Sequence, residues 1–239
     1  MQIYLFLSEI RYICIMIDEI KKYYDELASI YDNNRFENSY GKYVDLQERA
    51  FFKSRITKTE NSKILDLGCG TGRFLSFANF GVDISPNMIA ESKLKFPNIE
   101  FSEGSVSNIP FENNFFETIF SMHVIMHLNH EITMYFLDES HKKLQENGRL
   151  IFDFPSKKRR NLFKYKSNNW HGANSFSIDE INLIIHRKWK MTKLQGILFL
   201  PIHRFPKFSR AFFVKIDTFL CKSFLKEYAS YCIIELKKI

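Results

Sequence analysis

The chain has 239 residues, 45% of them hydrophobic and 26% charged, which suits one globular α/β domain with a substantial core. Four cysteines occur without a CxxC pair or metal-ligand spacing, which excludes a disulfide framework and a zinc site and fits a reducing cytoplasm: Cys14, Cys69, Cys221 and Cys232. No other metal-ligand pattern occurs, so we expect no metal.

The charge is unevenly distributed along the chain. Residues 151–239 contain 18 Lys and Arg against 6 Asp and Glu, whereas residues 1–150 contain 16 against 21. A solvated basic face is the favoured interpretation. The alternative is an anionic partner, such as a phosphate or carboxylate substrate, nucleic acid or an acidic membrane surface.

Residues 1–17 form an apolar stretch interrupted by Glu9 and Arg11. The stretch is too short and too charged to span a bilayer, and it lacks the basic start and small-residue cleavage site of a signal peptide. We therefore expect an N-terminal extension over 1–17. Translation from Met1 and translation from Met16 both stay open.

The first half of the chain alternates helical and strand patterns. Residues 18–52 have a helical period and predict a helical cap. Ser85 before Pro86 is a strong helix start, which predicts a helix to about Lys95. The strands predicted here are Lys63–Leu67, Gly81–Ile84 and Asn98–Ser102.

The second half continues the same rhythm. An amphipathic helix over Glu131–Gln145 should stop at Asn147-Gly148, and Ser177 with Glu180 forms a capping box before a helix over Ile181–Arg187. The strands predicted here are Phe116–His123, Arg149–Phe154, Met191–Leu200 and Tyr228–Leu236. The pattern predicts an α/β sandwich of three layers, with a seven-stranded, mostly parallel sheet, an antiparallel last strand and an N-terminal helical cap.

The strongest motif is the segment that runs from Ile64 to Phe74. Its apolar strand contains Asp66 and leads into Gly68, Gly70 and Gly72, which allow a tight turn whose backbone can approach a ligand. The spacing is GxGxG, with an acid two residues before the first glycine, rather than the GxGxxG of dinucleotide folds. A carboxylate there repels phosphate but suits a cofactor with an amino group and a sulfonium, which favours S-adenosylmethionine over NAD. A nicotinamide oxidoreductase is the remaining alternative.

From about Tyr24 onwards the sequence resembles the class I, Rossmann-like, S-adenosylmethionine-dependent methyltransferase family. The resemblance implies that Asp83 accepts hydrogen bonds from the ribose hydroxyls and that Tyr31-Asp32 closes over the cofactor. Asp66 and Asp83 are 17 positions apart, so we expect a shortened helix over Arg73–Asn79. The cofactor-binding residues implied are Tyr31, Asp66, Gly68, Cys69, Gly70, Gly72, Asp83, Ile84, Met88, Ser105, Val106, Ser121 and Met122.

The resemblance also divides residues 18–239, as one domain, into a cap (18–60), a cofactor-binding core (61–155) and a substrate-side region (156–239). His123 and His127 follow the fourth strand and are the candidate catalytic residues, since either could take a proton from an acceptor hydroxyl. A satisfied polar side chain is the alternative for both. The basic helical stretch 207–226 is expected to face the core, with peripheral contact to an anionic membrane as the second interpretation.

The predicted reaction is direct methyl transfer, which depends mainly on the alignment of nucleophile, methyl group and sulfur. The segment Ser121–Leu128 lacks the Asn/Asp-Pro-Pro-aromatic motif that many base and amide methyltransferases carry after the fourth strand. This absence favours a small-molecule or lipid-like acceptor. An RNA methyltransferase, suggested by the basic second half, and a non-catalytic cofactor-binding protein are the alternatives.

Overall fold

The computed structural model describes residues 18–32, 38–167, 172–185 and 187–239. The expected extension 1–17, with Cys14 and the alternative start Met16, lies outside the described residues.

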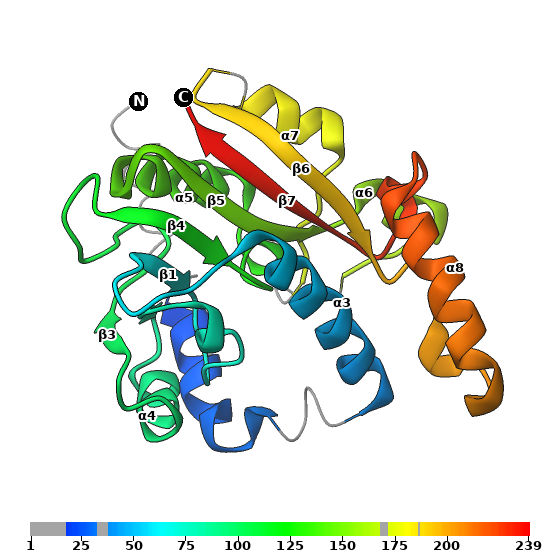
Figure 1. The fold of residues 1–239 in the computed structure, drawn as a ribbon, viewed down its shortest axis with the longest axis horizontal. Helices are drawn as coiled ribbons and strands as arrows, with labels where there is room; N and C mark the ends of the chain where they lie inside the picture. The colour runs from blue at the N-terminus through cyan, green and yellow to red at the C-terminus, as the bar shows by residue number, and fades with distance from the viewer. Residues whose placement is uncertain (1–17, 33–37, 168–171, 186) are drawn as a thin grey trace, which may run out of the picture.

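One seven-stranded sheet forms the centre of the molecule, in the order β3-β2-β1-β4-β5-β7-β6 (Figure 1). Strands β3 to β5 pair in parallel, and β7 is antiparallel to both β5 and β6. The predicted mostly parallel sheet with an antiparallel last strand is thus confirmed. The strands are β1 Ile64–Leu67, β2 Phe80–Asp83, β3 Glu100–Glu103, β4 Phe116–Ser121, β5 Leu144–Pro155, β6 Trp189–Ile197 and β7 Tyr231–Lys238.

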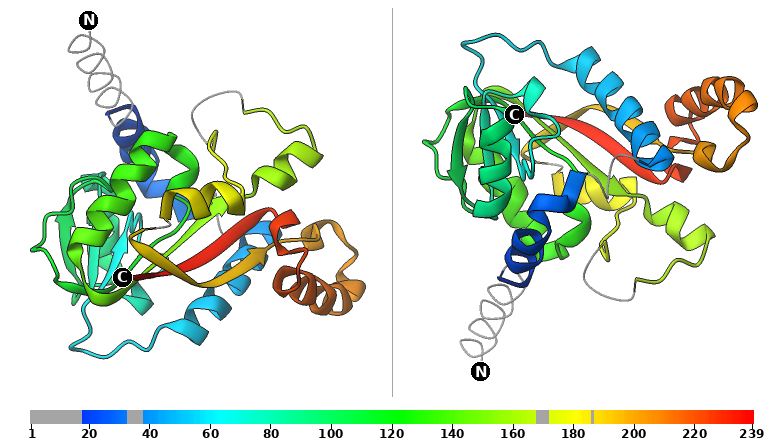
Figure 2. Two further views of the ribbon diagram at one scale, coloured as in Figure 1. Left: turned by 90° about the horizontal axis from the view of Figure 1, so that it is seen from above. Right: turned by 90° about the horizontal axis from the view of Figure 1, so that it is seen from below.

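Helices cover both faces of the sheet, which completes the three predicted layers (Figure 2). The α-helices are α3 Ser39–Arg55, α4 Pro86–Lys95, α5 His130–Lys143, α6 Lys157–Leu162, α7 Ile178–Ile185 and α8 Arg210–Lys222. Short 3₁₀ turns lie at η1 Ala28–Ile30, η2 Leu75–Phe77, η3 Ile125–His127, η4 Ile202–Arg204, η5 Lys207–Ser209 and η6 Lys226–Tyr228. The predicted cap is helical over residues 18–32 and again in α3.

The core consists of two clusters, one on each face of the sheet. Ile132 and Phe136 of α5 and Ile181 of α7 pack on one face, together with Ile20 of the N-terminal helical segment. On the other face, Phe51 and Phe52 of α3 pack against β1, β4 and η2. Because both faces are covered, the central strand β1 shows no alternation of buried and exposed positions, and all four of its residues are buried.

The predicted helix over Arg73–Asn79 is wrong, because the chain there forms turns and the single 3₁₀ turn η2. The segment must return along the length of β2, roughly 13 Å for four residues. Seven α-helical residues rise only about 10 Å, with further residues needed for the turns at both ends. The 3₁₀ turn η2 covers only three residues, about 6 Å at about 2.0 Å per residue, and turns and more extended residues cover the rest of the distance.

The predicted helix stop at Asn147-Gly148 is also wrong. Helix α5 ends at Lys143, and β5 begins at the next residue, where Leu144 pairs with Phe116 of β4. Asn147 adopts φ 63°, within an irregular stretch where the β4–β5 register shifts. The turn signal at Asn147 thus marks a distortion inside a strand instead of the end of a helix.

The other boundaries differ by a few residues. The capping box is confirmed, since the Ser177 hydroxyl accepts from the Glu180 N–H and the Glu180 carboxylate accepts from the Ser177 N–H. Helix α7 begins directly at Ile178, and β6 ends at Ile197, before Leu198 with φ 58°. Among the described residues, no helix combines the length and apolar character needed to cross a bilayer.

Phe52 offers a direct test of the α3 packing. Its side chain is fully buried, and its ring centroid lies 5.0 Å from that of Phe74 and 4.8 Å from that of Phe120. We expect Phe52→Ala to lower the free energy of unfolding by about 3–5 kcal/mol, because it leaves a cavity among aromatic rings. Urea denaturation measures the change. Leu94→Ala, at a position that is 80% exposed, is the control and should change it by less than about 0.5 kcal/mol. A similar loss in both variants would contradict this account of the core.

Candidate functional site

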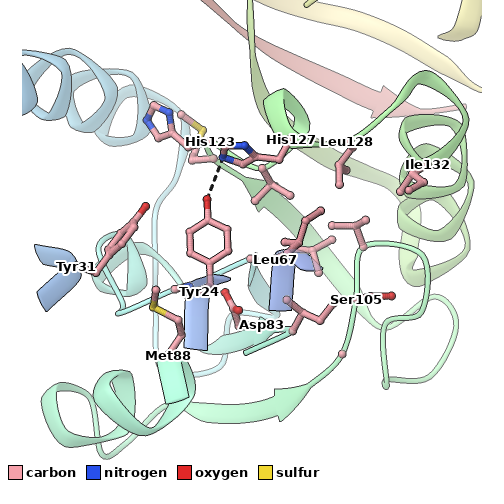
Figure 3. Close-up of a pocket in the computed structure, with 18 residues that line it drawn as sticks. Tyr24, Tyr31, Leu67, Asp83, Met88, Ser105, His123, His127, Leu128 and Ile132 are labelled. Carbon is pink, nitrogen blue, oxygen red and sulfur yellow. Dashed lines mark hydrogen bonds between the residues drawn. The ribbon is translucent and has the colours of Figure 1, made fainter. Parts of the chain in front are cut away.

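A pocket opens at the carboxyl ends of β1, β2 and β4, where open parallel sheets bind ligands (Figure 3). Three segments form this part of the pocket: the glycine loop after β1, the β2–α4 connection and the segment after β4. The sequence-predicted residues that line the pocket are Tyr31, Gly68, Gly70, Asp83, Ile84, Met88, Ser105, Val106, Met122, His123 and His127.

The glycine loop is held open by its backbone conformation. Gly68 has φ 79°, and a Cβ there would lie 2.4 Å from Cγ2 of Val124, so no larger residue fits. Gly70 has φ 52°, and a Cβ there would meet nothing within 4 Å. The loop therefore presents bare backbone to the pocket. The N–H groups of Gly68 and Cys69 donate to the Val82 carbonyl at 2.7 and 3.0 Å, which fixes the loop against β2.

Asp83 ends β2 and connects the loop to the next turn. Its Oδ2 accepts from the Gly70 N–H at 2.7 Å, and its Oδ1 accepts from the Ser85 N–H at 2.9 Å. Burial raises the pKa of Asp83, although these backbone hydrogen bonds oppose the shift. A carboxylate oxygen has two acceptor sites, so each oxygen keeps capacity for a ligand hydroxyl.

Four sequence-predicted cofactor residues stand behind the pocket wall and do not line it. Asp66 is buried, and its burial and the nearby Asp83 raise its pKa well above the ordinary value. Ser121 is fully buried, and Cys69 is a buried thiol. A Cβ on Gly72 would lie 2.8 Å from the Phe96 ring, so Gly72 makes room for packing. These residues support the loop from within the protein.

The N-terminal helical segment 18–32 closes the pocket from the side opposite the sheet. Asp32 accepts a hydrogen bond from the Thr71 hydroxyl of the glycine loop, and Asp25 accepts one from the Ser85 hydroxyl after β2. These contacts place Tyr24 and Tyr31 over the pocket, with ring centroids 6.0 Å apart (Figure 3).

His127 links this segment to the far wall of the pocket. The Gly172 N–H donates to its Nδ1 at 3.0 Å, and its Nε2 lies 3.0 Å from the Tyr24 hydroxyl, the contact drawn as a dashed line in Figure 3. Because Nδ1 accepts, the hydrogen-bond network assigns the proton to Nε2, which donates to the phenol oxygen. The unprotonated ring nitrogen, Nδ1, therefore already accepts a hydrogen bond from the Gly172 backbone.

His123 belongs to a buried cluster of charges. It has φ 60°, and its backbone N–H donates to Asp153 Oδ1 at 2.5 Å. Its Nε2 lies 2.7 Å from Glu48 Oε1, and the Arg73 guanidinium lies 2.5 Å from the other Glu48 oxygen. The donor atoms of Glu48, His123 and Asp153 lie within 4.8 Å of one another, as in some metal sites. Here, however, both Glu48 oxygens already face cationic side chains.

The charges in this cluster shift its pKa values. Burial favours the neutral imidazole, but the charges of Glu48 and Asp153 outweigh burial and raise the pKa of His123. Burial disfavours the Glu48 anion, but His123 and Arg73 reverse this and lower the pKa of Glu48. Burial raises the pKa of Asp153. Both shifts act in the direction of an imidazolium paired with the Glu48 carboxylate.

Several pocket and cluster residues were missed by the sequence analysis. The additional lining residues are Ile20, Tyr24, Leu67, Val124, Leu128 and Ile132. A usable signal existed for Glu48 and Asp153, since each is an acid within an apolar pattern. Glu48 shares a helix face with Val44, Phe51 and Phe52, and Asp153 interrupts an apolar strand. A charge at such a position needs a buried partner.

Comparison with known proteins places these features in a wider context. A family described as methyltransferase domain matches residues 65–152. An uncharacterized protein of Methanocaldococcus jannaschii is 31% identical over 250 residues, covering 92% of this chain and 91% of the relative.

Two further similar proteins carry names that state an activity. A demethylmenaquinone methyltransferase of Chlorobaculum tepidum is 31% identical over 109 residues, which cover 42% of this chain and 45% of that enzyme, so the match spans under half of the relative. Among solved structures, a SAM-dependent methyltransferase from Thermotoga maritima superposes with a TM-score of 0.67 at 17% identity, covering 89% of this chain and 98% of that one. This likeness shows the fold.

The His123 cluster makes a testable prediction about protonation. We expect His123 to titrate above its ordinary pKa of about 6.5. His141 and His203 should titrate below it, because burial lowers the pKa of both. The proton on His123 thus stabilises the fold fully below about pH 6.5, and this contribution is lost as the pH rises through the raised pKa.

Imidazole NMR across a pH series measures these values. Glu48→Gln removes the nearest anion and should lower the pKa of His123 while leaving that of His203 unchanged. A His123 resonance that titrates below the one from His203 in the unsubstituted protein would contradict the imidazolium assignment.

Proposed function

The chain belongs to the class I S-adenosylmethionine-dependent methyltransferase family, and on that premise we propose that it transfers the methyl group to a small, largely apolar acceptor. One observation carries the proposal. The pocket combines the bare glycine loop and Asp83 with a wall of apolar side chains from the N-terminal helical segment, the segment after β4 and α5. These additional side chains are Ile20, Val124, Leu128 and Ile132.

The residues present fit S-adenosylmethionine, the cofactor of this family. The open space beside Gly70 leaves room for a ligand against the backbone. Asp83, Ile84 and Val106 all line the pocket, where the carboxylate would accept from two adjacent ribose hydroxyls and the two apolar side chains would contact the adenine. S-adenosylmethionine has no phosphate group. Its binding therefore avoids the repulsion that a phosphate would meet from the neighbouring buried acids Asp66 and Asp83.

The bound cofactor would supply a methyl group on a sulfonium. The acceptor nucleophile would bond to that methyl carbon while the carbon–sulfur bond breaks and S-adenosylhomocysteine leaves. The protein's contribution is alignment and exclusion of water. Tyr24 and Tyr31 cover the pocket from the N-terminal helical segment, and the Asp32–Thr71 and Asp25–Ser85 contacts hold that segment on the loops that bind the cofactor. Thus the lid and the cofactor loops form one connected unit.

Catalysis by His123 or His127 as a general base stays a prediction, and the contacts favour positioning roles for both. Nε2 of His123 lies 2.7 Å from a Glu48 oxygen, and Nδ1 of His127 accepts from the Gly172 N–H, so groups of the protein already occupy these ring nitrogens. The arrangement therefore favours an acceptor that reaches the site with its nucleophilic atom already carrying a lone pair or a negative charge, such as an acidic phenol, an enolate or a neutral amine.

The apolar wall supports a hydrophobic acceptor over a nucleotide. The named relative from Chlorobaculum tepidum acts on demethylmenaquinone, and a fused aromatic ring of that general kind suits apolar side chains together with two tyrosines. RNA methylation, suggested by the basic residues 151–239, is the alternative outcome of the experiment below.

The decisive experiment is incubation of the full chain with S-adenosylmethionine labelled in the methyl group and a cell extract. Separation into lipid, small-molecule, RNA and protein fractions then locates the label. We expect it in the lipid or small-molecule fraction, and only with protein that binds the cofactor. Label confined to RNA would favour the alternative, and label in no fraction would favour a non-catalytic cofactor-binding protein.

Asp83→Ala tests the ribose contact. We expect its affinity for S-adenosylhomocysteine to fall by about 1–3 kcal/mol, roughly 5- to 150-fold, because the ribose hydroxyls lose a charged acceptor. Isothermal titration calorimetry measures the loss. Asp138→Ala is a matched control on α5, where the Asp138 side chain is 46% exposed and pairs with Lys188. Equal affinities for Asp83→Ala and the unsubstituted protein would refute the assigned role of Asp83.

Gly70→Val tests the bare loop. The valine side chain would project into the open space of the pocket, and its backbone would pay a conformational cost at φ 52°. We expect a folded protein with no measurable affinity for S-adenosylhomocysteine. Gly70→Ala shares the backbone conformation and fills less space, so it should retain more affinity. Circular dichroism checks the fold, and normal binding by the valine variant would overturn the loop assignment.

A further inference from the structure

Helix α8 lies at one end of the molecule (Figure 1). The helix and its flanking turns expose four phenylalanines, which we call the phenylalanine row. The exposed fractions are 90% for Phe208, 64% for Phe212, 72% for Phe219 and 89% for Phe224. Buried or half-buried positions are usual for this residue type, and contiguous exposed apolar groups mark interaction sites. We name the exposed surface of residues 204–226 the α8 surface.

The inner side of α8 is fixed by a buried polar contact. Asp217 is fully buried and accepts from the Tyr43 hydroxyl at 2.8 Å and from the Gln47 amide at 2.6 Å, both on α3. Its other oxygen accepts from the Leu200 N–H at 2.5 Å. Because this side of the helix must face α3, the opposite side must face outward. The expectation that the helix faces the core is thus correct for one side only.

The outward side has a regular pattern. Phe212 and Phe219 are seven residues apart, so their side chains leave the helix within about 20° of each other. Lys215 and Lys222 have the same spacing and follow the edge of the phenylalanine row. An apolar row bordered by lysines is the arrangement of a helix that lies in a membrane interface, because long lysine stems reach outward to lipid phosphates while the rings enter the acyl region.

The charge of the α8 surface has one sign. Residues 204–226 contain six basic residues, and their only acid is Asp217, which is buried. The basic residues are Arg204, Lys207, Arg210, Lys215, Lys222 and Lys226. A surface of this kind is complementary to an anionic bilayer, whose attraction for each lysine or arginine acts within a Debye length of the lipid headgroups.

A second exposed aromatic group lies at the same end of the molecule. Helix α6 and the residues after it expose Leu162, Phe163 and Tyr165, and both views in Figure 2 place α6 and α8 at one end of the sheet. Arg159 of α6 joins α6 to the segments before and after α8, since its guanidinium donates to the carbonyls of Phe199 and Tyr228 at 2.9 Å each. Apolar and basic groups from two elements thus gather on one end.

We propose that the α8 surface docks the protein onto an anionic lipid bilayer. The phenylalanine row enters the headgroup–acyl boundary, and the surrounding lysines contact lipid phosphates. No helix among the described residues could span the bilayer, so the contact is peripheral. The proposal does not depend on methyl transfer, because α8 lies outside the residues that line the cofactor pocket. It also gives a role to six of the 18 basic residues of 151–239.

Cosedimentation of the full chain with vesicles tests the proposal. We expect binding to vesicles of phosphatidylcholine with about one third phosphatidylglycerol, little binding to phosphatidylcholine alone, and weakening by salt. Phe212→Ser with Phe219→Ser should lower the partition coefficient on the order of tenfold or more, because the row loses its apolar surface. Lys215→Glu with Lys222→Glu should abolish the preference for anionic lipid.

The matched control is Leu94→Ser with Leu183→Ser, which removes two leucines that are 80% and 74% exposed on α4 and α7. This variant should bind vesicles like the unsubstituted protein, and S-adenosylhomocysteine titration should be normal in every variant. The proposal would be overturned if the leucine control lost as much vesicle binding as Phe212→Ser with Phe219→Ser. It would also be overturned if the unsubstituted protein showed no preference for anionic vesicles. Retention on RNA that Phe212→Ser with Phe219→Ser weakens, without vesicle binding, would instead assign the surface to RNA.

Discussion

The buried charge cluster around Glu48 is the constraint on which the site depends. A carboxylate in the interior requires cationic partners, and Glu48 finds them in Arg73 of the glycine loop and His123 after β4. Asp153 of β5 completes the arrangement by accepting from the His123 backbone. One acid on α3 thus fixes the relative positions of the two segments that form the floor of the pocket, and the unusual φ of His123 is held by these contacts.

This cluster also explains how the glycine loop stays rigid without a full helix behind it. The segment after Gly72 has only the 3₁₀ turn η2, so it lacks the helix that usually stabilises such a loop. Side-chain contacts take that role. Arg73 binds Glu48 and Asp45 on α3, and Thr71 binds Asp32 on the N-terminal helical segment. The loop is therefore clamped between two helical segments that precede it in the chain.

The pocket and the α8 surface are separate features that suit one another chemically. The pocket lies beyond β1, β2 and β4 and has an apolar wall, whereas the α8 surface lies at the end of the molecule that α6 and α8 form (Figure 1). A membrane-soluble acceptor would be most concentrated at a bilayer, where the proposed docking surface would hold the enzyme. The two proposals remain independent, since cofactor binding and vesicle binding are measured separately.

The sequence by itself determined the sheet, the glycine loop and Asp83. Apolar strands, glycines and helix caps are local signals, and the positive φ of Gly68 and Gly70 requires glycine wherever the loop lies. Only the tertiary structure decided which side chains contact one another in the charge cluster and in the pocket. Glu48 and His123 are far apart in sequence, and no local rule states that they meet in the interior. Tyr24 and Ile132 also reach one pocket only because α5 and the N-terminal helical segment pack on the same face of the sheet. The sequence could not predict which side of α8 faces solvent, because an amphipathic pattern does not identify the element against which a helix packs. In the structure, the contacts of Asp217 with Tyr43 and Gln47 orient the helix against α3.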